Sequence, residues 1–226
     1  MWKANFFPRG TGWFCWIDMA LAVICCKVLE KEIRAVIGDT PAVEHLTVME
    51  WGLHSRPNLL LEALCERIRV IQDKVDAVFL GYGRCQALDK LPLDFKVPVF
   101  YPEGEDCIGV LLGQDRYQEE LFREAFTWFL TPGWAAMGID FVFQELQLRS
   151  MAEKGIDPLQ LAHHALKDYR RTLVIEMETE DSESLLKKGQ EFADEFNMRL
   201  EKTRGSLSAL ERAFGKALRH CSKATR

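Results

Sequence analysis

The stretch "LAVICCKVLEKEIRAVIG" (residues 21–38) predicts a buried strand that passes directly into a helix. Its first six residues are all apolar, which is typical of a strand covered on both faces. From residue 27 onward, apolar residues recur at helical spacing, and Gly38 is typical of a helix end. Two thiols, Cys25 and Cys26, stand at the point where the strand becomes the helix.

The same alternation of apolar runs and amphipathic stretches continues along the chain. Further strands are predicted at 45–51, 77–82, 97–101, 127–131, 172–178 and 198–202. Helices are predicted over 136–170 with a break at 154–158, over 183–196, over 206–220, and from Pro57 onward. Strands that alternate with helices indicate βαβ units. We therefore predict an α/β fold, with a Rossmann-like, mostly parallel sheet and helices on both faces.

The composition is that of an ordinary globular protein. The chain has 226 residues, of which 48% are hydrophobic and 28% charged, with a formal net charge of -5. The negative charge argues against a nucleic-acid partner, because such a partner requires a basic face. We find neither a secretory signal nor an apolar run long enough to span a membrane. With seven cysteines and no signal, we predict a cytoplasmic protein with reduced thiols and no membrane partner.

Residues 1–18 precede the first regular element and read as an N-terminal extension. Residues 19–226 are predicted to form a single α/β domain with its site at the carboxyl edge of the sheet. Four consecutive strand ends carry a thiol or an imidazole there, namely Cys25 and Cys26 after the first strand, then His54, Cys85 and Cys107. Thiolate and imidazole are the preferred ligands of zinc and of other soft or borderline metals, so this distribution predicts a metal site.

Each of these residues also has a plain structural interpretation. Free cysteine is among the most buried residue types, so Cys25 or Cys26 can be core. One of the two must point away from the site, because side chains alternate along a strand. His54 can instead cap the helix that starts at Pro57. Cys85 lies in a polar turn between glycines, which is a poor place for a core thiol, and it is the strongest single candidate.

The motifs "CCKVLEKEI", "LHSRP", "VDAVFLGYGRCQALDKL", "PEGEDCIGVLLG" and "TWFLTPGW" together resemble domain-of-unknown-function family 1638 over roughly residues 20–205. The resemblance implies an α/β fold from prokaryotes, many of them anaerobic, often encoded near corrinoid-dependent methyltransferases. The family pattern implies that Cys26, His54, Cys85 and Cys107 form the site. This chain has Lys27 where members often have glycine, and "DC" at 106–107 where some have "HC".

The leading hypothesis is a metal site with Cys26, His54, Cys85 and Cys107 as ligands. Zinc is the first choice of metal and an iron–sulfur cluster the second. A shell of Arg56, Glu105 and Trp134 would hold a bound group, with Arg56 orienting an anion. Two alternatives stay open. The first is a non-catalytic corrinoid-pathway accessory protein, which would bind a corrinoid, a small molecule or a corrinoid protein. The second is a metal-free thiol enzyme with Cys26 as nucleophile.

Overall fold

The computed structural model describes residues 19–152 and 154–224, so the extension expected at residues 1–18 lies outside the described part. Its strands form two sheets in which every pair of neighbouring strands is parallel. The first sheet has the order β2-β1-β3-β4 and the second has the order β5-β6-β7. The strands are β1 (Leu21–Cys26), β2 (Val43–Met49), β3 (Ala77–Gly81), β4 (Val99–Phe100), β5 (Thr127–Leu130), β6 (Arg171–Glu176) and β7 (Arg199–Arg204).

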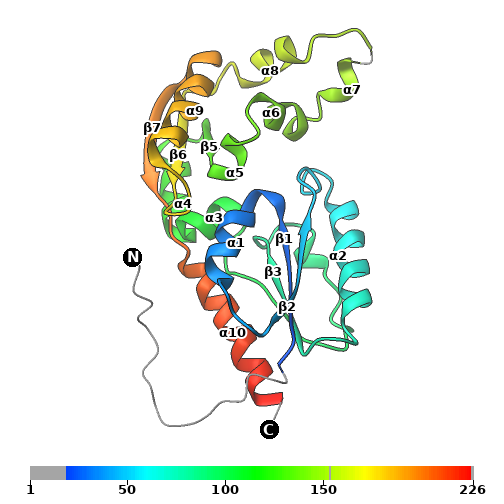
Figure 1. The fold of residues 1–226 in the computed structure, drawn as a ribbon. Helices are drawn as coiled ribbons and strands as arrows, with labels where there is room; N and C mark the ends of the chain where they lie inside the picture. The colour runs from blue at the N-terminus through cyan, green and yellow to red at the C-terminus, as the bar shows by residue number, and fades with distance from the viewer. Residues whose placement is uncertain (1–18, 153, 225–226) are drawn as a thin grey trace.

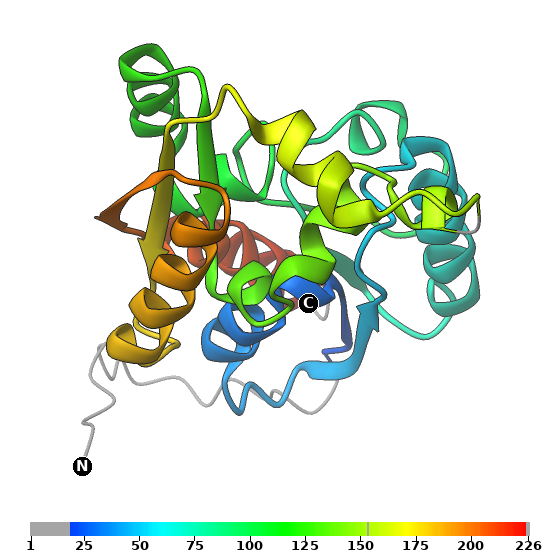
Figure 2. The ribbon, with the colours of Figure 1, turned by 90° about the horizontal axis from the view of Figure 1, so that it is seen from above.

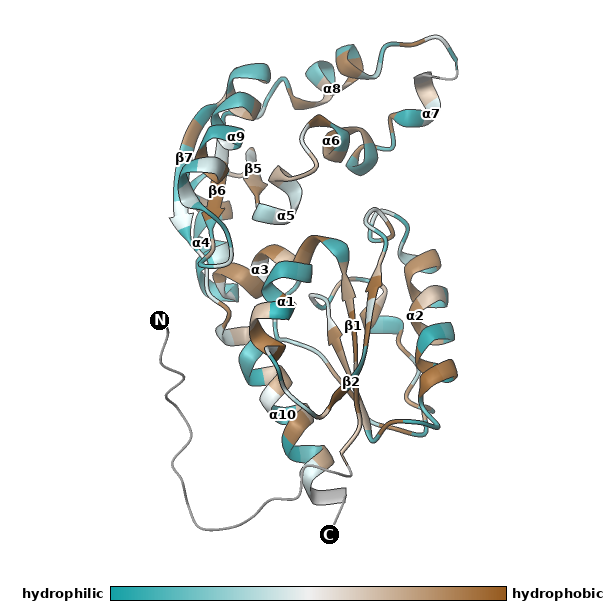
Figure 3. Ribbon diagram, in the orientation of Figure 1, coloured by the Kyte–Doolittle hydropathy of each residue, from teal (hydrophilic) through white to brown (hydrophobic). Residues whose placement is uncertain are grey.

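The first sheet is covered on both faces by helices (Figure 1). Helix α2 (Pro57–Ile71) packs on one face, while α1 (Glu30–Ile37) and α10 (Ser208–Ala224) pack on the other. β1 is apolar along its whole length, as its brown colour in Figure 3 shows, because its alternate side chains enter the two cores. A short 3-10 helix, η2 (Lys27–Leu29), joins β1 to α1. Another, η3 (Leu88–Lys90), follows β3.

The second sheet carries α9 (Ser182–Glu195) on one face, while α3 (Cys107–Leu112) and α4 (Gln114–Arg123) lie against the other. Its connections contribute α5 (Pro132–Ala135), α6 (Ile139–Glu145), α7 (Arg149–Ala152) and α8 (Pro158–Leu166). A fully buried guanidinium, Arg171 at the start of β6, pairs with the carboxylates of Glu120 and Glu201. This cluster joins α4 to β6 and β7 at the amino end of the sheet.

The two sheets face each other through their carboxyl edges. Figure 1 shows the arrowhead of β1 pointing up and that of β7 pointing down, toward the first sheet. Seen from above, the light green segments after β5 lie over the blue β1–α1 unit (Figure 2). Helix α10 returns from the second sheet to the first, and one hydrophobic cluster contains residues of both, including Phe79 and Leu173. Segments from both sheets therefore surround the space between the two edges.

The predicted parallel α/β class and the start of α2 at Pro57 are confirmed. The strands, however, are divided between two sheets, because β5 pairs with β6 and not with any strand of the first sheet. The sequence analysis also did not predict α3 and α4. Five of the six residues of α3 are buried, so the helix lacks the polar face that gives a helical period.

Candidate functional site

A cavity of about 470 Å³ lies between the carboxyl edge of the first sheet and the helices α5 and α6. Its walls come from the loops after β1, β2 and β3, from the start of α3, and from α5 and α6. It contains all four residues that the sequence predicted as metal ligands: Cys26, His54, Cys85 and Cys107. We call it the thiol cavity. Widely separated segments of the chain thus meet at one edge, as the parallel topology requires.

Of the two adjacent thiols at the end of β1, only Cys26 lines the thiol cavity. Cys25 points to the opposite face of the sheet, where it is 0% exposed and packs in the core shared with α1 and α10. Burial, and to a smaller extent the charge of Cys26, raises the pKa of the Cys25 thiol to about 12. Cys25 is therefore a core thiol, and the alternation of the strand selects Cys26 for the site.

His54 lies in the loop after β2 and reaches α6 across the cavity. Its Nε2 is 2.5 Å from Oε2 of Glu145, and the hydroxyl of Ser55 donates to the same oxygen at 3.5 Å. Burial lowers the pKa of the imidazole, but hydrogen bonds to Cys26 and Glu145 and the charges of both outweigh burial, so the pKa rises to about 10. His54 is therefore a protonated imidazole at neutral pH, placed between a thiol and a carboxylate.

The turn after β3 brings Tyr82 and Cys85 to the cavity. A Cβ on Gly83 would overlap the backbone of Asp106, so only glycine permits this approach of the turn to the start of α3. Tyr82 is 5% exposed, and burial together with the charges of Cys26, Cys25 and Cys85 raises the pKa of its phenol. Among the described residues, its hydroxyl has no hydrogen-bond partner.

Cys107 is the first residue of α3, not part of a strand-end loop as the sequence predicted. Asp106 caps this helix, because its side chain accepts a hydrogen bond from the amide of Gly109 at 2.8 Å. Tyr117 donates to the other oxygen of Asp106 at 2.8 Å. Burial, and then the charges of Asp106 and Cys26, raise the pKa of the Cys107 thiol well above its usual value. Cys107 is therefore a neutral thiol in this conformation.

Trp134 is brought to the cavity by the short helix that follows β5. The hydroxyl of Thr131 accepts a hydrogen bond from the amide of Trp134 at 3.3 Å and so caps α5. A Cβ on Gly133 would overlap the carbonyl of Val28, so glycine allows α5 to pack directly on η2. The indole stacks on Phe141 with ring centroids 4.5 Å apart. The predicted residue Trp134 thus lines the cavity in a fixed orientation.

Glu105 and Arg56, the other two members of the predicted shell, differ from each other in whether they line the thiol cavity. Glu105 lines the cavity but is exposed, and it accepts a hydrogen bond from Gln118 at 3.0 Å. Arg56 precedes α2, is exposed, and is not among the residues that line the cavity. The structure therefore does not bring Arg56 together with the four cysteine and histidine candidates.

The side chains of the cavity do not form a coordination sphere in this conformation. Within residues 19–152 and 154–224, no group of three or more His, Cys, Asp or Glu side chains is arranged to hold a metal ion. One nitrogen of His54 is also directed at Glu145. The four candidates thus share a cavity without the fit that a preformed zinc site would have, and the metal site stays a prediction.

Sequence reasoning missed Glu145 and Tyr82. Glu145 occurs in a long helical stretch without any local motif, and only the fold places it beside His54. Tyr82 belongs to the quoted turn "GYGRC", but nothing in that motif distinguishes a buried phenol from an exposed one. The pairing of His54 with a carboxylate was therefore not predictable from residue spacing.

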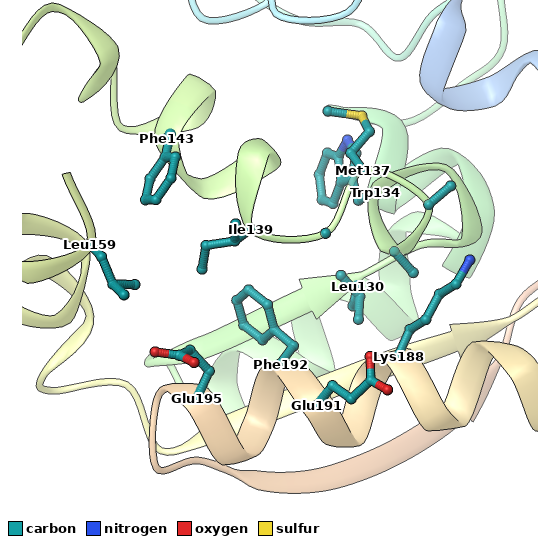
Figure 4. Close-up of a pocket in the computed structure, with 13 residues that line it drawn as sticks. Leu130, Trp134, Met137, Ile139, Phe143, Leu159, Lys188, Glu191, Phe192 and Glu195 are labelled. Atoms are coloured by element: carbon teal, nitrogen blue, oxygen red, sulfur yellow. The ribbon is translucent and has the colours of Figure 1, made fainter. Parts of the chain in front are cut away.

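A second cavity, of about 500 Å³, lies between the segment after β5 and helix α9 (Figure 4). We call it the apolar cavity, because its walls are mainly apolar and aromatic side chains, such as Leu130, Ile139, Phe143 and Phe192. It contains no cysteine or histidine, and Lys188, Glu191 and Glu195 are its charged lining residues. Trp134 lines both cavities and forms part of the wall between them.

Comparison with known proteins identifies a family but no activity. The family model described as "Protein of unknown function (DUF1638)" matches residues 48–214, which is more than half of the chain. No curated protein and no solved structure matches the chain. In the part of the chain that the structure describes, no helix combines the length and the apolar character needed to cross a membrane.

Proposed function

The chain belongs to the family of proteins of unknown function DUF1638, and we propose that it is a thiol enzyme with Cys26 as its nucleophile. In this proposal, His54 holds the proton of the Cys26 thiol, so that the sulfur reacts as a thiolate, and Glu145 orients the imidazole. The observation that carries it is the position of His54, which contacts Glu145 at 2.5 Å and lines the same cavity as Cys26. A nucleophile, a base within hydrogen-bond reach and a third group that orients the base are the usual parts of covalent catalysis.

The surroundings of Cys26 also support this role. Cys26 ends a strand at the edge where ligands bind in α/β sheets, and it lines a cavity large enough for a small molecule. A protonated imidazole beside a sulfur stabilises negative charge on it, which is how cysteine nucleophiles are activated. Cys107 lines the same cavity but has a raised pKa, so it is the weaker nucleophile of the two.

Selective alkylation tests the proposal. With iodoacetamide in substoichiometric amount near neutral pH, peptide mapping should find Cys26 modified before Cys25, Cys65, Cys85 and Cys107. His54→Gln should slow the modification of Cys26 by about 10-fold or more, since the proton partner is lost. His163→Gln is the matched control, because His163 also pairs with a glutamate but lies at the surface, away from the cavity. Unchanged reactivity of Cys26 in His54→Gln would contradict the proposal.

A metal-binding function is the second candidate, with the ligands Cys26, His54, Cys85 and Cys107. What supports it is that all three thiols and the imidazole line one cavity. A histidine that contacts a carboxylate through one nitrogen, as His54 contacts Glu145, is also the usual arrangement around a bound metal. The side chains would have to move closer together to become ligands, because they are not arranged as such in the described residues.

Metal analysis of protein purified without oxygen separates the two candidates. A bound metal with one equivalent per chain, lost in Cys85→Ser, would favour the second candidate. Zinc and iron are distinguished by the same analysis, and an iron–sulfur cluster would also colour the protein. Corrinoid binding stays a proposal that rests on the family resemblance, and co-elution of the protein with cobalamin tests it.

A further inference from the structure

Two buried hydrogen-bond donors of the thiol cavity have no partner in the part of the chain that the structure describes. They are the hydroxyl of Tyr82 and the indole Nε1–H of Trp134, neither of which makes a hydrogen bond within residues 19–152 and 154–224. A buried polar group that makes no hydrogen bond costs about 1–3 kcal/mol, so most such groups in folded proteins are paired. Two unpaired donors that line one cavity therefore indicate a ligand that accepts hydrogen bonds.

Both donors lie close to the proposed nucleophile and its partner. Tyr82 lines the same cavity as Cys26 and packs in the same hydrophobic cluster. The ring of Trp134 is 6.5 Å from the ring of His54, measured between centroids. Figure 4 shows the indole nitrogen on the edge of the ring that is turned away from Leu130 and Phe192, which line the apolar cavity.

The two donors are also held rigidly. Trp134 is fixed by the capped α5, by its stacking on Phe141, and by the close packing of Gly133 on Val28. Tyr82 directly follows β3 and is fixed by its burial against the core beneath α2. Rigid donors that need no rearrangement are the groups that stabilise a developing oxyanion most effectively.

The charge of the cavity points to a neutral ligand with an acceptor oxygen. An indole N–H can only donate a hydrogen bond, and a phenol hydroxyl can also donate one, so a single acceptor oxygen would satisfy both groups. Carboxylates predominate among the charged lining residues, which are Asp89, Glu105, Asp106 and Glu145 against Arg84 and His54. An anionic ligand such as a phosphate or a dicarboxylate would be repelled by this lining.

We propose that Tyr82 and Trp134 bind the carbonyl oxygen of an uncharged acyl substrate, an ester or a thioester. This inference rests on the proposed function of Cys26. The Cys26 sulfur forms a bond to the carbonyl carbon, and the π electrons of the C=O bond move to the oxygen, which accepts hydrogen bonds from Tyr82 and Trp134. When the C=O bond re-forms, the alcohol or thiol leaves with the proton held by His54. Water then adds to the thioester carbon and the C–S bond breaks, which releases a carboxylic acid and returns the thiol.

Acylation and alkylation of the same sulfur separate the two proposals. The acyl probe is 4-nitrophenyl acetate, whose reaction builds charge on a carbonyl oxygen, and the alkyl probe is iodoacetamide, whose reaction at Cys26 does not. Tyr82→Phe and Trp134→Phe should each slow acylation of Cys26 by about 10-fold or more and leave its alkylation unchanged. Trp128→Phe is the matched control, because its indole nitrogen is also buried without a partner among the described residues but does not line the cavity.

If acylation of Cys26 is equally fast in wild type and in both variants, the donor role of Tyr82 and Trp134 is overturned. In that case, normal alkylation of Cys26 would still leave the proposed function intact. Equal slowing of both reactions would also overturn it, because the substitution would then act by displacing Cys26. If iodoacetamide does not select Cys26 in the wild-type protein, the proposed function fails first and the acyl assignment fails with it.

Discussion

The side chains of His54 and Glu145 meet at 2.5 Å although they belong to opposite sides of the cavity. His54 follows β2 of the first sheet, whereas Glu145 ends α6, which follows the first strand of the second sheet. The contact is supported by Gln147, which donates to the carbonyl of Ser55 at 3.3 Å, and by Arg149, which lies 5.6 Å from the ring centroid of Trp51. The proposed catalytic arrangement is therefore complete only when the two sheets face each other as described.

The His54–Glu145 contact makes stability depend on pH. The folded pKa of His54 is about 10, against an ordinary value of 6.5. Its contribution to the free energy of unfolding is therefore fully present below pH 6.5 and is lost as the pH rises through about 10. Glu145→Gln should lower the free energy of unfolding by about 1.5–3 kcal/mol at neutral pH, as expected for a lost hydrogen bond between charged groups. Urea unfolding at several pH values measures both effects.

Glu195→Gln is the control for this experiment, because it removes the carboxylate of the exposed His163–Glu195 pair. That pair is exposed, so we expect a change below about 1 kcal/mol. A wild-type protein whose stability does not fall between neutral pH and about pH 10 would be inconsistent with a protonated His54.

Gly133→Ala should displace Trp134 from the cavity. The added Cβ would overlap the carbonyl of Val28, which is backbone and therefore has little freedom to yield. We expect a loss of about 1–3 kcal/mol in the free energy of unfolding and a shift in tryptophan fluorescence.

Gly215→Ala provides the contrast for this substitution. Gly215 lies within α10, and a Cβ there would meet only the flexible end of the Arg219 side chain. Alanine should therefore stabilise α10 by about 0.5–1 kcal/mol. Equal effects of the two substitutions would show that the packing of α5 on η2 is not tight.

Arg171→Met should destabilise the second sheet. The guanidinium is fully buried, and its loss leaves Glu120 and Glu201 with only exposed arginines as partners. We expect a cost of about 3 kcal/mol, measured by urea unfolding. Arg199→Met, at an exposed arginine that pairs with Glu124 and Glu201, should cost less than about 1 kcal/mol. A similar cost at both positions would mean that the burial of Arg171 is not important.

Treatment with a chelator distinguishes the thiol proposal from the metal proposal. If Cys26 acts without a metal, prolonged incubation with a strong chelator should leave both its alkylation rate and the stability of the protein unchanged. Under the metal proposal, removal of the ion should expose Cys26, Cys85 and Cys107 together and raise the rate of modification at all three. Peptide mapping after labelling reads the three positions separately.

Local pattern was sufficient to predict much of the fold. The β1–α1 unit, the start of α2 at Pro57 and the parallel α/β class follow from the distribution of apolar residues and from proline. The prediction that thiols and His54 meet at one edge followed from the parallel topology.

The division into two sheets was not predictable from such patterns. It depends on which strand β5 joins, and strand pairing is a long-range choice. The pairing of His54 with Glu145 depends in turn on that division, because it joins segments that are 91 residues apart in the chain. No periodicity or motif around Glu145 indicates that it pairs with His54. The sequence analysis therefore predicted the thiols but not the carboxylate.

The central claim is that Cys26, His54 and Glu145 act as one unit, and a double-mutant cycle tests it most directly. The quantity measured is the rate at which iodoacetamide modifies Cys26 in wild type, His54→Gln, Glu145→Gln and the double variant. Since Glu145 acts through His54, the double variant should react no more slowly than His54→Gln alone. The account would be contradicted if the reductions in the modification rate of Cys26 multiplied in the double variant. It would also be contradicted if both single variants reacted at the wild-type rate.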